Sequence, residues 1–202
     1  MADLFQNLAE APDQILQMIG TSLEGRAKDP AQQAILESYI DDLTIGDSAV
    51  VVELGCGTGP VCRRFAEIDQ VDRVIGIEPA VGLVERANQL ATNRKLEFHV
   101  GRGEATTLDD GIADIVVLAL GLNKQTKNLF NSKKFEWLKS DAVVINVARG
   151  NVIEQKAFYE WLVAHPKARG CIDAWWREPI NDGDFDTEYP FLSLPNVFGS
   201  PH

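Results

Sequence analysis

The sequence predicts an α/β fold in which a doubly wound parallel sheet follows an N-terminal helical prefix. From residue 48 onward, short runs rich in valine and isoleucine alternate with amphipathic stretches of helical periodicity. Most positions in these runs are apolar, as expected of strands covered on both faces. Residues 55–59 form a glycine-rich segment between the first such run and the next amphipathic stretch. Together these observations favour strands and helices in alternation, with parallel strands side by side.

The prefix, residues 1–47, is predicted to contain two helices. Apolar residues recur at helical spacing in residues 3–19 and 31–43. The second stretch has clear start signals, because Asp29 can cap the helix and Pro30 suits its first position.

Residues 48–202 are predicted to form one Rossmann-like nucleotide-binding domain, with no linker inside it. Strand order 3-2-1-4-5-6 is expected for its core, with right-handed crossovers. The expected strands are residues 49–54, 73–78, 96–100, 112–120, 142–148, 169–174 and 196–200. Helices are expected near residues 60–68, 80–93, 131–139 and 154–164.

Composition excludes several classes of partner. The formal net charge of -11 disfavours nucleic acid and anionic membranes, which bind clustered lysine and arginine. The chain has no apolar run long enough to span a bilayer, and its first residues are acidic rather than basic. We therefore expect a cytoplasmic protein whose partner is a small molecule. The 3 cysteines lack metal-ligand spacing, so no metal site is predicted.

The glycine loop is the first candidate site. Glycines at 55, 57 and 59 suit a tight turn that a ligand approaches closely, but Pro60 stands where a dinucleotide fingerprint has its third glycine. The string VELGCGTG resembles the loop of class I S-adenosylmethionine-dependent methyltransferases, and this resemblance covers about residues 15–118. It implies that the three glycines and Glu53 lie near the methionine part of that cofactor.

Two further acids complete the expected adenosine site. Glu78 ends the second predicted strand, where a carboxylate can accept hydrogen bonds from a ribose diol. That placement suits S-adenosylmethionine and NAD but disfavours the 2′-phosphate of NADP. Alternatively, Glu78 only caps the helix that follows. Glu104 is the substitute for the acid that usually holds adenine in the methyltransferase family.

The second half carries a different resemblance. The segments LNKQTKNLFN, INVARGNVI, GCIDAWWREP and LPNVFGSPH, within residues 119–202, resemble in order and spacing the motifs of D-2-hydroxyacid dehydrogenases. By this resemblance Arg149 orients the substrate, His202 is the acid/base and Glu178 holds its imidazole. Asp173 would meet the nicotinamide carboxamide. These residue types suit hydride transfer to a ketone, because that transfer leaves an alkoxide that needs a proton.

The two resemblances together suggest a hybrid, natural or engineered, with a seam near residues 113–122. Its leading predicted function is binding of S-adenosylmethionine or S-adenosylhomocysteine. The alternatives are an NAD-linked 2-hydroxyacid oxidoreductase and a structural hybrid without activity. We expect no appreciable turnover, because residues 1–48 do not have the pattern of a substrate-binding domain.

Overall fold

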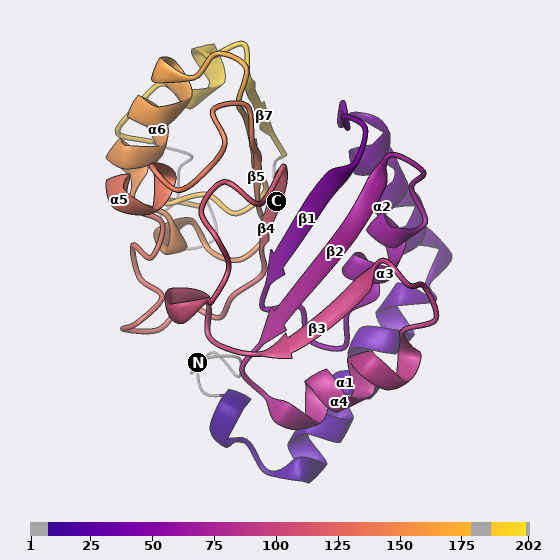
Figure 1. The fold of residues 1–202 in the computed structure, drawn as a ribbon. Helices are drawn as coiled ribbons and strands as arrows, with labels where there is room; N and C mark the ends of the chain where they lie inside the picture. Colours follow the sequence, from indigo (N-terminus) through magenta and orange to yellow (C-terminus); the bar gives the residue numbers. More distant parts are fainter. Residues whose placement is uncertain (1–7, 179–186, 201–202) are drawn as a thin grey trace. The chain divides into compact units, whose positions relative to one another are not determined.

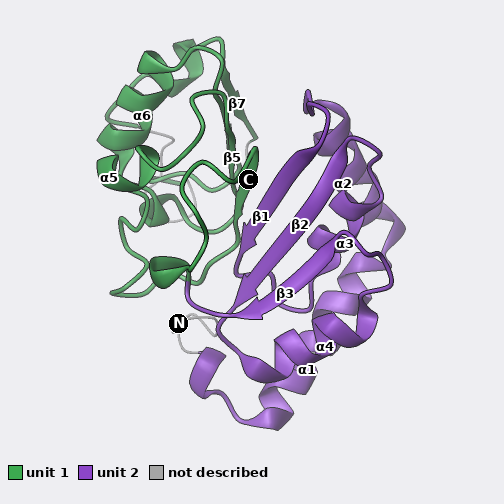
Figure 2. Cartoon of the chain, in the orientation of Figure 1, with its two compact units in different colours: residues 1–6, 103–202 green, residues 7–102 purple. Residues whose placement is uncertain are grey.

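The computed structural model describes residues 8–178 and 187–200, and the chain divides into two compact units (Figure 2). The N-terminal unit comprises residues 7–102, and the C-terminal unit includes everything from residue 103 onward. The division falls ahead of the predicted seam at 113–122. The described part of the predicted prefix belongs to the N-terminal unit. That residues 48–202 behave as one domain stays a prediction.

The N-terminal unit contains three parallel strands in the order β3-β2-β1 (Figure 1). Its helices gather along one face of these strands (Figure 1). In chain order its elements are η1 (Leu8–Glu10), α1 (Asp13–Ala27), α2 (Pro30–Asp41), β1 (Ala49–Leu54), α3 (Pro60–Ala66), β2 (Val71–Glu78), α4 (Val81–Leu90) and β3 (Leu96–Val100).

The two prefix helices compare differently with their predictions. Helix α2 begins as predicted, because Asp29 Oδ1 accepts hydrogen bonds from the backbone amides of Ala31 and Gln32 at 2.9 and 3.1 Å. The first helix was expected at residues 3–19, whereas α1 runs from residue 13 to residue 27. It continues through Gly20, where a Cβ would lie 3.3 Å from Thr58 Cγ2. Close tertiary packing at that position outweighs the low helix propensity of glycine.

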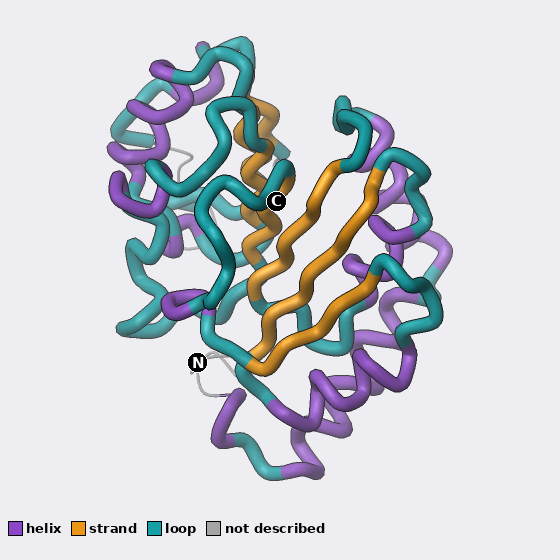
Figure 3. Tube along the Cα trace, in the orientation of Figure 1, coloured by secondary structure: helices purple, strands orange, loops and turns teal. Residues whose placement is uncertain are grey.

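The C-terminal unit contains four parallel strands in the order β4-β5-β6-β7. Figure 3 distinguishes the strands, helices and loops of the chain by colour. The elements of the C-terminal unit are η2 (Gly103–Ala105), β4 (Ile115–Leu118), α5 (Ser132–Phe135), β5 (Val143–Asn146), η3 (Gly150–Val152), α6 (Gln155–Ala164), β6 (Arg169–Ile172), η4 (Phe191–Ser193) and β7 (Val197–Gly199). Helix α5 is shorter than the predicted 131–139, because the amides of Trp137 and Leu138 bond to carbonyls three residues back and tighten the chain into turns.

An aromatic cluster forms much of the core of the C-terminal unit. Phe135 of α5 stacks on Phe158 and Trp161 of α6, with ring centroids 5.3 and 5.1 Å apart. Phe158 also contacts Phe191 of η4 at 5.8 Å. Buried Asn196 donates from Nδ2 to the carbonyls of Leu162 and Ala168, so it ties the end of α6 to the segment before β7.

The predicted fold class is therefore confirmed. Every paired strand is parallel, helices separate the strands along the chain, and the orders 3-2-1 and 4-5-6 are those predicted, with β7 added beside β6. Among the described residues, no helix combines the length and apolar character needed to cross a membrane.

Candidate functional site

The glycine loop of the N-terminal unit joins β1 to α3 through three residues with positive φ. These angles are 85° at Gly55, 56° at Gly57 and 76° at Gly59. Residues with a β-carbon rarely adopt such angles, which explains why glycine recurs at every second position. Gly59 is the N-cap of α3, and Pro60 occupies the first turn of that helix.

Neighbouring side chains pack closely on this loop. A Cβ at Gly59 would lie 2.4 Å from the Phe98 ring of β3, and one at Gly57 would lie 2.7 Å from Leu23 Cδ1 of α1. A side chain at either position would displace its neighbour. The loop therefore depends on glycine for both its backbone angles and its packing.

Glu78 braces the glycine loop from the end of β2. Its Oε2 accepts the Gly57 amide at 3.1 Å and its Oε1 accepts the Ala80 amide at 3.0 Å. The side chain is only 2% exposed, and burial raises the pKa of its carboxyl above the ordinary value even though the two amides oppose the shift. Because Ala80 is the N-cap of α4, Glu78 does act at the start of the next helix. Each carboxylate oxygen keeps a further lone pair for a hydroxyl donor.

Glu53, like Glu78, is buried, and it lies one residue before the end of β1. It is 4% exposed, and its Oε2 accepts a hydrogen bond from the Cys62 thiol at 2.8 Å. Burial raises the pKa of Glu53 to about 7, although the hydrogen bond to Cys62 favours the charged form. The thiol remains protonated and able to donate, since its hydrogen bond with Cys56 and its burial raise the pKa of Cys62. Glu53 is thus a buried group that titrates near neutral pH.

In the C-terminal unit, the dehydrogenase-like residues follow two adjacent parallel strands. Arg149 comes after β5, whereas Asp173 and Glu178 come after β6, and β5 pairs with β6. Parallel strands end at one edge of a sheet, so these residues share that edge. Arg149 is exposed and donates from Nη1 to the Ala148 carbonyl at 2.6 Å. His202 lies outside the described residues.

Asn146, which sequence reasoning missed, joins the two loops of this edge. Its backbone carbonyl accepts the amides of Asp173 and Ala174 at 3.0 and 3.2 Å. Its side-chain Nδ2 donates to the carbonyls of Arg149 and Ala174 at 3.2 and 3.4 Å. A polar residue at the end of the apolar run AVVIN was the available signal. Asn146 is 1% exposed, as expected of a positioning group.

Gly150 allows the same two loops to touch. A Cβ there would lie 2.3 Å from the carbonyl carbon and oxygen of Trp175 and 2.4 Å from the Trp176 amide nitrogen. The peptide after Trp175 therefore packs directly on the backbone of Gly150. Glycine is required at position 150 by this contact and not by the backbone angle, because the φ of Gly150 is not positive.

Asp173, Glu178 and Trp175 form further contacts at this edge. The Ser200 hydroxyl, after β7, donates to Asp173 Oδ1. Trp175 Nε1 donates to the Ser200 carbonyl at 2.8 Å, and the Trp175 amide donates to Glu178 Oε1 at 3.2 Å. Asp173 and Glu178 are therefore held by neighbouring loop groups. Glu104 lies in η2 of the C-terminal unit, half-buried, whereas Glu78 belongs to the N-terminal unit.

Comparisons with known proteins agree with the arrangement of the C-terminal unit. The family model described as D-isomer specific 2-hydroxyacid dehydrogenase, NAD binding domain, matches residues 86–202. D-3-phosphoglycerate dehydrogenase of Archaeoglobus fulgidus is 28% identical over 157 residues, which are 78% of this chain and 27% of that protein. Glyoxylate reductase of Thermococcus kodakarensis is 32% identical over 154 residues, covering 69% of this chain and 44% of the relative.

A solved structure shows the same fold. The D-isomer specific 2-hydroxyacid dehydrogenase from Xanthobacter autotrophicus Py2, in complex with NADPH and MES, aligns with a TM-score of 0.60 at 22% identity. The alignment covers 94% of this chain and 58% of that one. The chain thus spans less than two thirds of each of these relatives.

The dehydrogenase likeness is not confined to the second half of the chain. The family model begins at residue 86, and a match that covers 78% of the chain necessarily includes the glycine loop and residues 113–122. The comparisons therefore support the dehydrogenase resemblance, whereas the methyltransferase resemblance and the hybrid stay hypotheses. With the motifs, the fold and the family match in agreement, the chain belongs to the D-isomer specific 2-hydroxyacid dehydrogenase family, of which it contains the NAD-binding domain.

Proposed function

We propose that this chain binds NAD, with the adenosine half of the nucleotide held by the N-terminal unit. The observation that carries the proposal is the pairing of the glycine loop with Glu78, whose carboxylate bonds to the amide of Gly57. A ribose diol that reaches Glu78 would donate to lone pairs that the two backbone amides leave available. Gly55, Gly57 and Gly59 would lie beside the nucleotide, since positions that lack a β-carbon allow its close approach.

Glu78 also favours NAD over NADP. A carboxylate accepts hydrogen bonds from a 2′-hydroxyl but repels a 2′-phosphate. Burial raises the pKa of Glu78, so this preference should be strongest above that pKa, where the carboxyl group is charged and repels a phosphate. The bound NADPH of the Xanthobacter relative is a property of that protein.

For the C-terminal unit we propose the roles that the family resemblance implies. Asp173 would accept a hydrogen bond from the carboxamide of the nicotinamide, whose ring would supply hydride chemistry. Arg149 would orient a substrate carboxylate with its planar guanidinium, and Glu178 would favour the protonated form of His202. We propose nucleotide binding as the activity of the chain itself, in the cytoplasm, and assign no turnover to it.

S-adenosylmethionine is the second candidate ligand. Pro60 in the first turn of α3 favours it, because the third glycine of a dinucleotide fingerprint is missing there. Glu53 and Glu104 would then complete the site in the way that the methyltransferase resemblance implies. S-adenosylhomocysteine would bind the same groups. Comparing the affinities for NAD, NADP, S-adenosylmethionine and S-adenosylhomocysteine therefore separates the two candidates.

The substitution Glu78→Ala tests the proposed ribose contact. We expect it to weaken NAD binding by about 1.5 to 3 kcal/mol, the range for hydrogen bonds to a charged group. Glu85→Ala is the control, because Glu85 is an exposed acid on α4 in the same unit. Isothermal titration calorimetry measures both affinities, and circular dichroism checks that each variant is folded. Equal affinity of the folded Glu78→Ala variant and the original chain would rule out the contact.

A further inference from the structure

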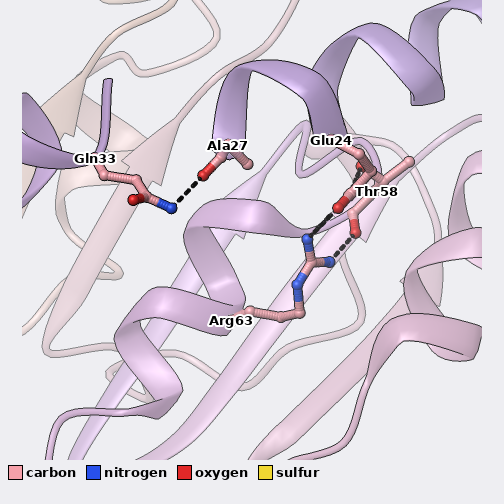
Figure 4. Close-up of polar contacts among 5 residues, drawn as sticks. All are labelled: Glu24, Ala27, Gln33, Thr58 and Arg63. Atoms are coloured by element: carbon pink, nitrogen blue, oxygen red, sulfur yellow. Dashed lines mark hydrogen bonds and ion pairs between the residues drawn. The ribbon is translucent and has the colours of Figure 1, made fainter. Parts of the chain in front are cut away.

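Helix α1 lies against the glycine loop and bonds to it through one acidic side chain. Glu24 Oε1 accepts a hydrogen bond from the Thr58 hydroxyl at 2.6 Å. Both carboxylate oxygens of Glu24 also accept from Arg63 Nη2, at 2.9 and 2.7 Å. Arg63 completes the triangle by donating from Nη1 to the Thr58 carbonyl at 2.7 Å. Figure 4 shows the three side chains converging between α1 and the start of α3.

Packing by α1 covers the same loop. Thr58 is 0% exposed, and its methyl lies 3.3 Å from where a Cβ of Gly20 would be. Leu23 contacts Gly57 closely enough that a Cβ there would be 2.7 Å away. Inside the loop, the amide of Gly57 bonds to Glu78 and that of Gly59 bonds to the Cys56 carbonyl. With α1 in place, residues 56–59 of the loop are buried.

Few side chains of α1 are buried for a helix of 15 residues. Its buried residues are Leu16 and Gly20, and Leu16 packs with Ala80 and Leu83 near the start of α4. The side chains of Glu24 and Arg63 are 16% and 21% exposed, so water and ions reach the ion pair at its edge. At the C-terminal end of α1, Gln33 of α2 donates to the Ala27 carbonyl at 2.9 Å (Figure 4). Displacement of α1 therefore breaks the Leu16 cluster, the packing of Gly20 and Leu23 on the loop, and the bonds of Glu24.

We propose that the Thr58 hydroxyl and the Arg63 guanidinium are the donors for the pyrophosphate of the nucleotide, and that Glu24 occupies them in a closed state. A carboxylate and a phosphate accept from the same donors, and arginine binds either one in a bidentate manner. Glu24 thus takes the place of the ligand's anion, and α1 is a lid that the nucleotide displaces. This inference rests on the proposed function, since it names the donors and the regulation of the same site.

Population arithmetic gives the direction of the effect. When only the open state binds, the apparent dissociation constant rises as the open fraction falls. Removing the charge of Glu24 weakens the closed state without touching the donors on Thr58 and Arg63. Removing the guanidinium of Arg63 weakens the closed state equally. It also deletes one of the two proposed donors to the pyrophosphate. The two variants should therefore agree in opening and disagree in affinity.

The test compares Glu24→Gln, Arg63→Gln and a matched control in the full chain. Glu37→Gln is that control. It breaks the ion pair between Arg64 of α3 and Glu37 of α2, which does not include the glycine loop. Hydrogen exchange of residues 55–59 without nucleotide measures opening, and calorimetry with NAD measures binding. We expect roughly tenfold faster exchange in Glu24→Gln and Arg63→Gln, and roughly tenfold tighter NAD binding in Glu24→Gln alone. Glu37→Gln should change neither quantity.

The exchange measurement separates this inference from the proposed function. Faster exchange in both variants with no NAD binding in any protein would refute the proposed function and the pyrophosphate assignment, but would support the lid. Unchanged exchange, or weaker binding in Glu24→Gln, would overturn the lid. Tighter binding in Arg63→Gln would overturn its role as a donor. Should Glu24→Gln fail to fold, Glu24→Asp keeps the charge but shortens its reach, and it should give intermediate exchange.

Discussion

Replacing Gly150 with alanine should lower the free energy of unfolding by about 3 kcal/mol, at the upper end of the cost of overpacking. The added methyl group would lie 2.3 Å from the carbonyl carbon and oxygen of Trp175. Those atoms belong to the backbone, so no rotamer change relieves the clash. Either the loop after β5, which contains Gly150, or the loop after β6 must shift. Such a shift also disturbs the hydrogen bonds that Asn146 makes to both loops. Urea unfolding monitored by tryptophan fluorescence measures the loss.

Gly25→Ala provides the comparison for this substitution. Gly25 lies inside α1, and a Cβ there would meet no heavy atom within 4 Å. Alanine should therefore stabilise that helix by up to about 1 kcal/mol through its higher helix propensity. If the two variants shift the unfolding midpoint in the same direction by a similar amount, the backbone contact of Gly150 is not the cause.

The buried carboxyl of Glu53 should make the protein less stable as the pH rises from about 4.5 to about 7, the reverse of the usual carboxylate effect. Its pKa is raised from 4.5 to about 7 by burial. In this window the folded chain binds a proton that the unfolded chain has lost, so stability falls with increasing pH. The shift corresponds to a loss of about 3 kcal/mol across the window.

Glu53→Gln isolates this contribution. Glutamine keeps an oxygen that can accept from the Cys62 thiol but does not titrate. The free energy of unfolding in urea, measured at intervals from pH 4.5 to pH 8, should fall less steeply in the variant than in the original chain. Glu78 retains its own raised pKa, so some slope should persist. Identical pH profiles for the two proteins would show that Glu53 is not the titrating group.

Local signals in the sequence predicted the elements well where a few adjacent residues determine them. Asp29 and Pro30 specify the start of α2, and the structure shows that cap with its hydrogen bonds. Helix α1 was misplaced, since its extent depends on Gly20 packing against Thr58, a residue far along the chain. The strand order followed from the two family resemblances, because both families share the order 3-2-1-4 for their first strands and later strands added to the fourth keep right-handed crossovers.

Residue types at the site were predictable, but their contacts were not. The glycine pattern indicated a tight loop, and the structure gives all three glycines positive φ. The contact of Glu24 with Thr58 joins residues 34 positions apart, and no local pattern specifies such a pairing. Asn146 was missed for a similar reason, because its partners lie on two separate loops. Arg149, Asp173 and Glu178 were found through a motif resemblance, and their roles stay predictions.

Calorimetric titration of the unmodified chain with NAD, NADP, S-adenosylmethionine and S-adenosylhomocysteine tests the NAD assignment most directly. Glu78 at the ribose position predicts that NAD binds, and that it binds more tightly than NADP because the 2′-phosphate of NADP meets a carboxyl group. We expect S-adenosylmethionine and S-adenosylhomocysteine to bind more weakly than NAD. Saturable binding of either methyltransferase ligand, with no heat from NAD up to millimolar concentration, would contradict the assignment and favour the methyltransferase-like site.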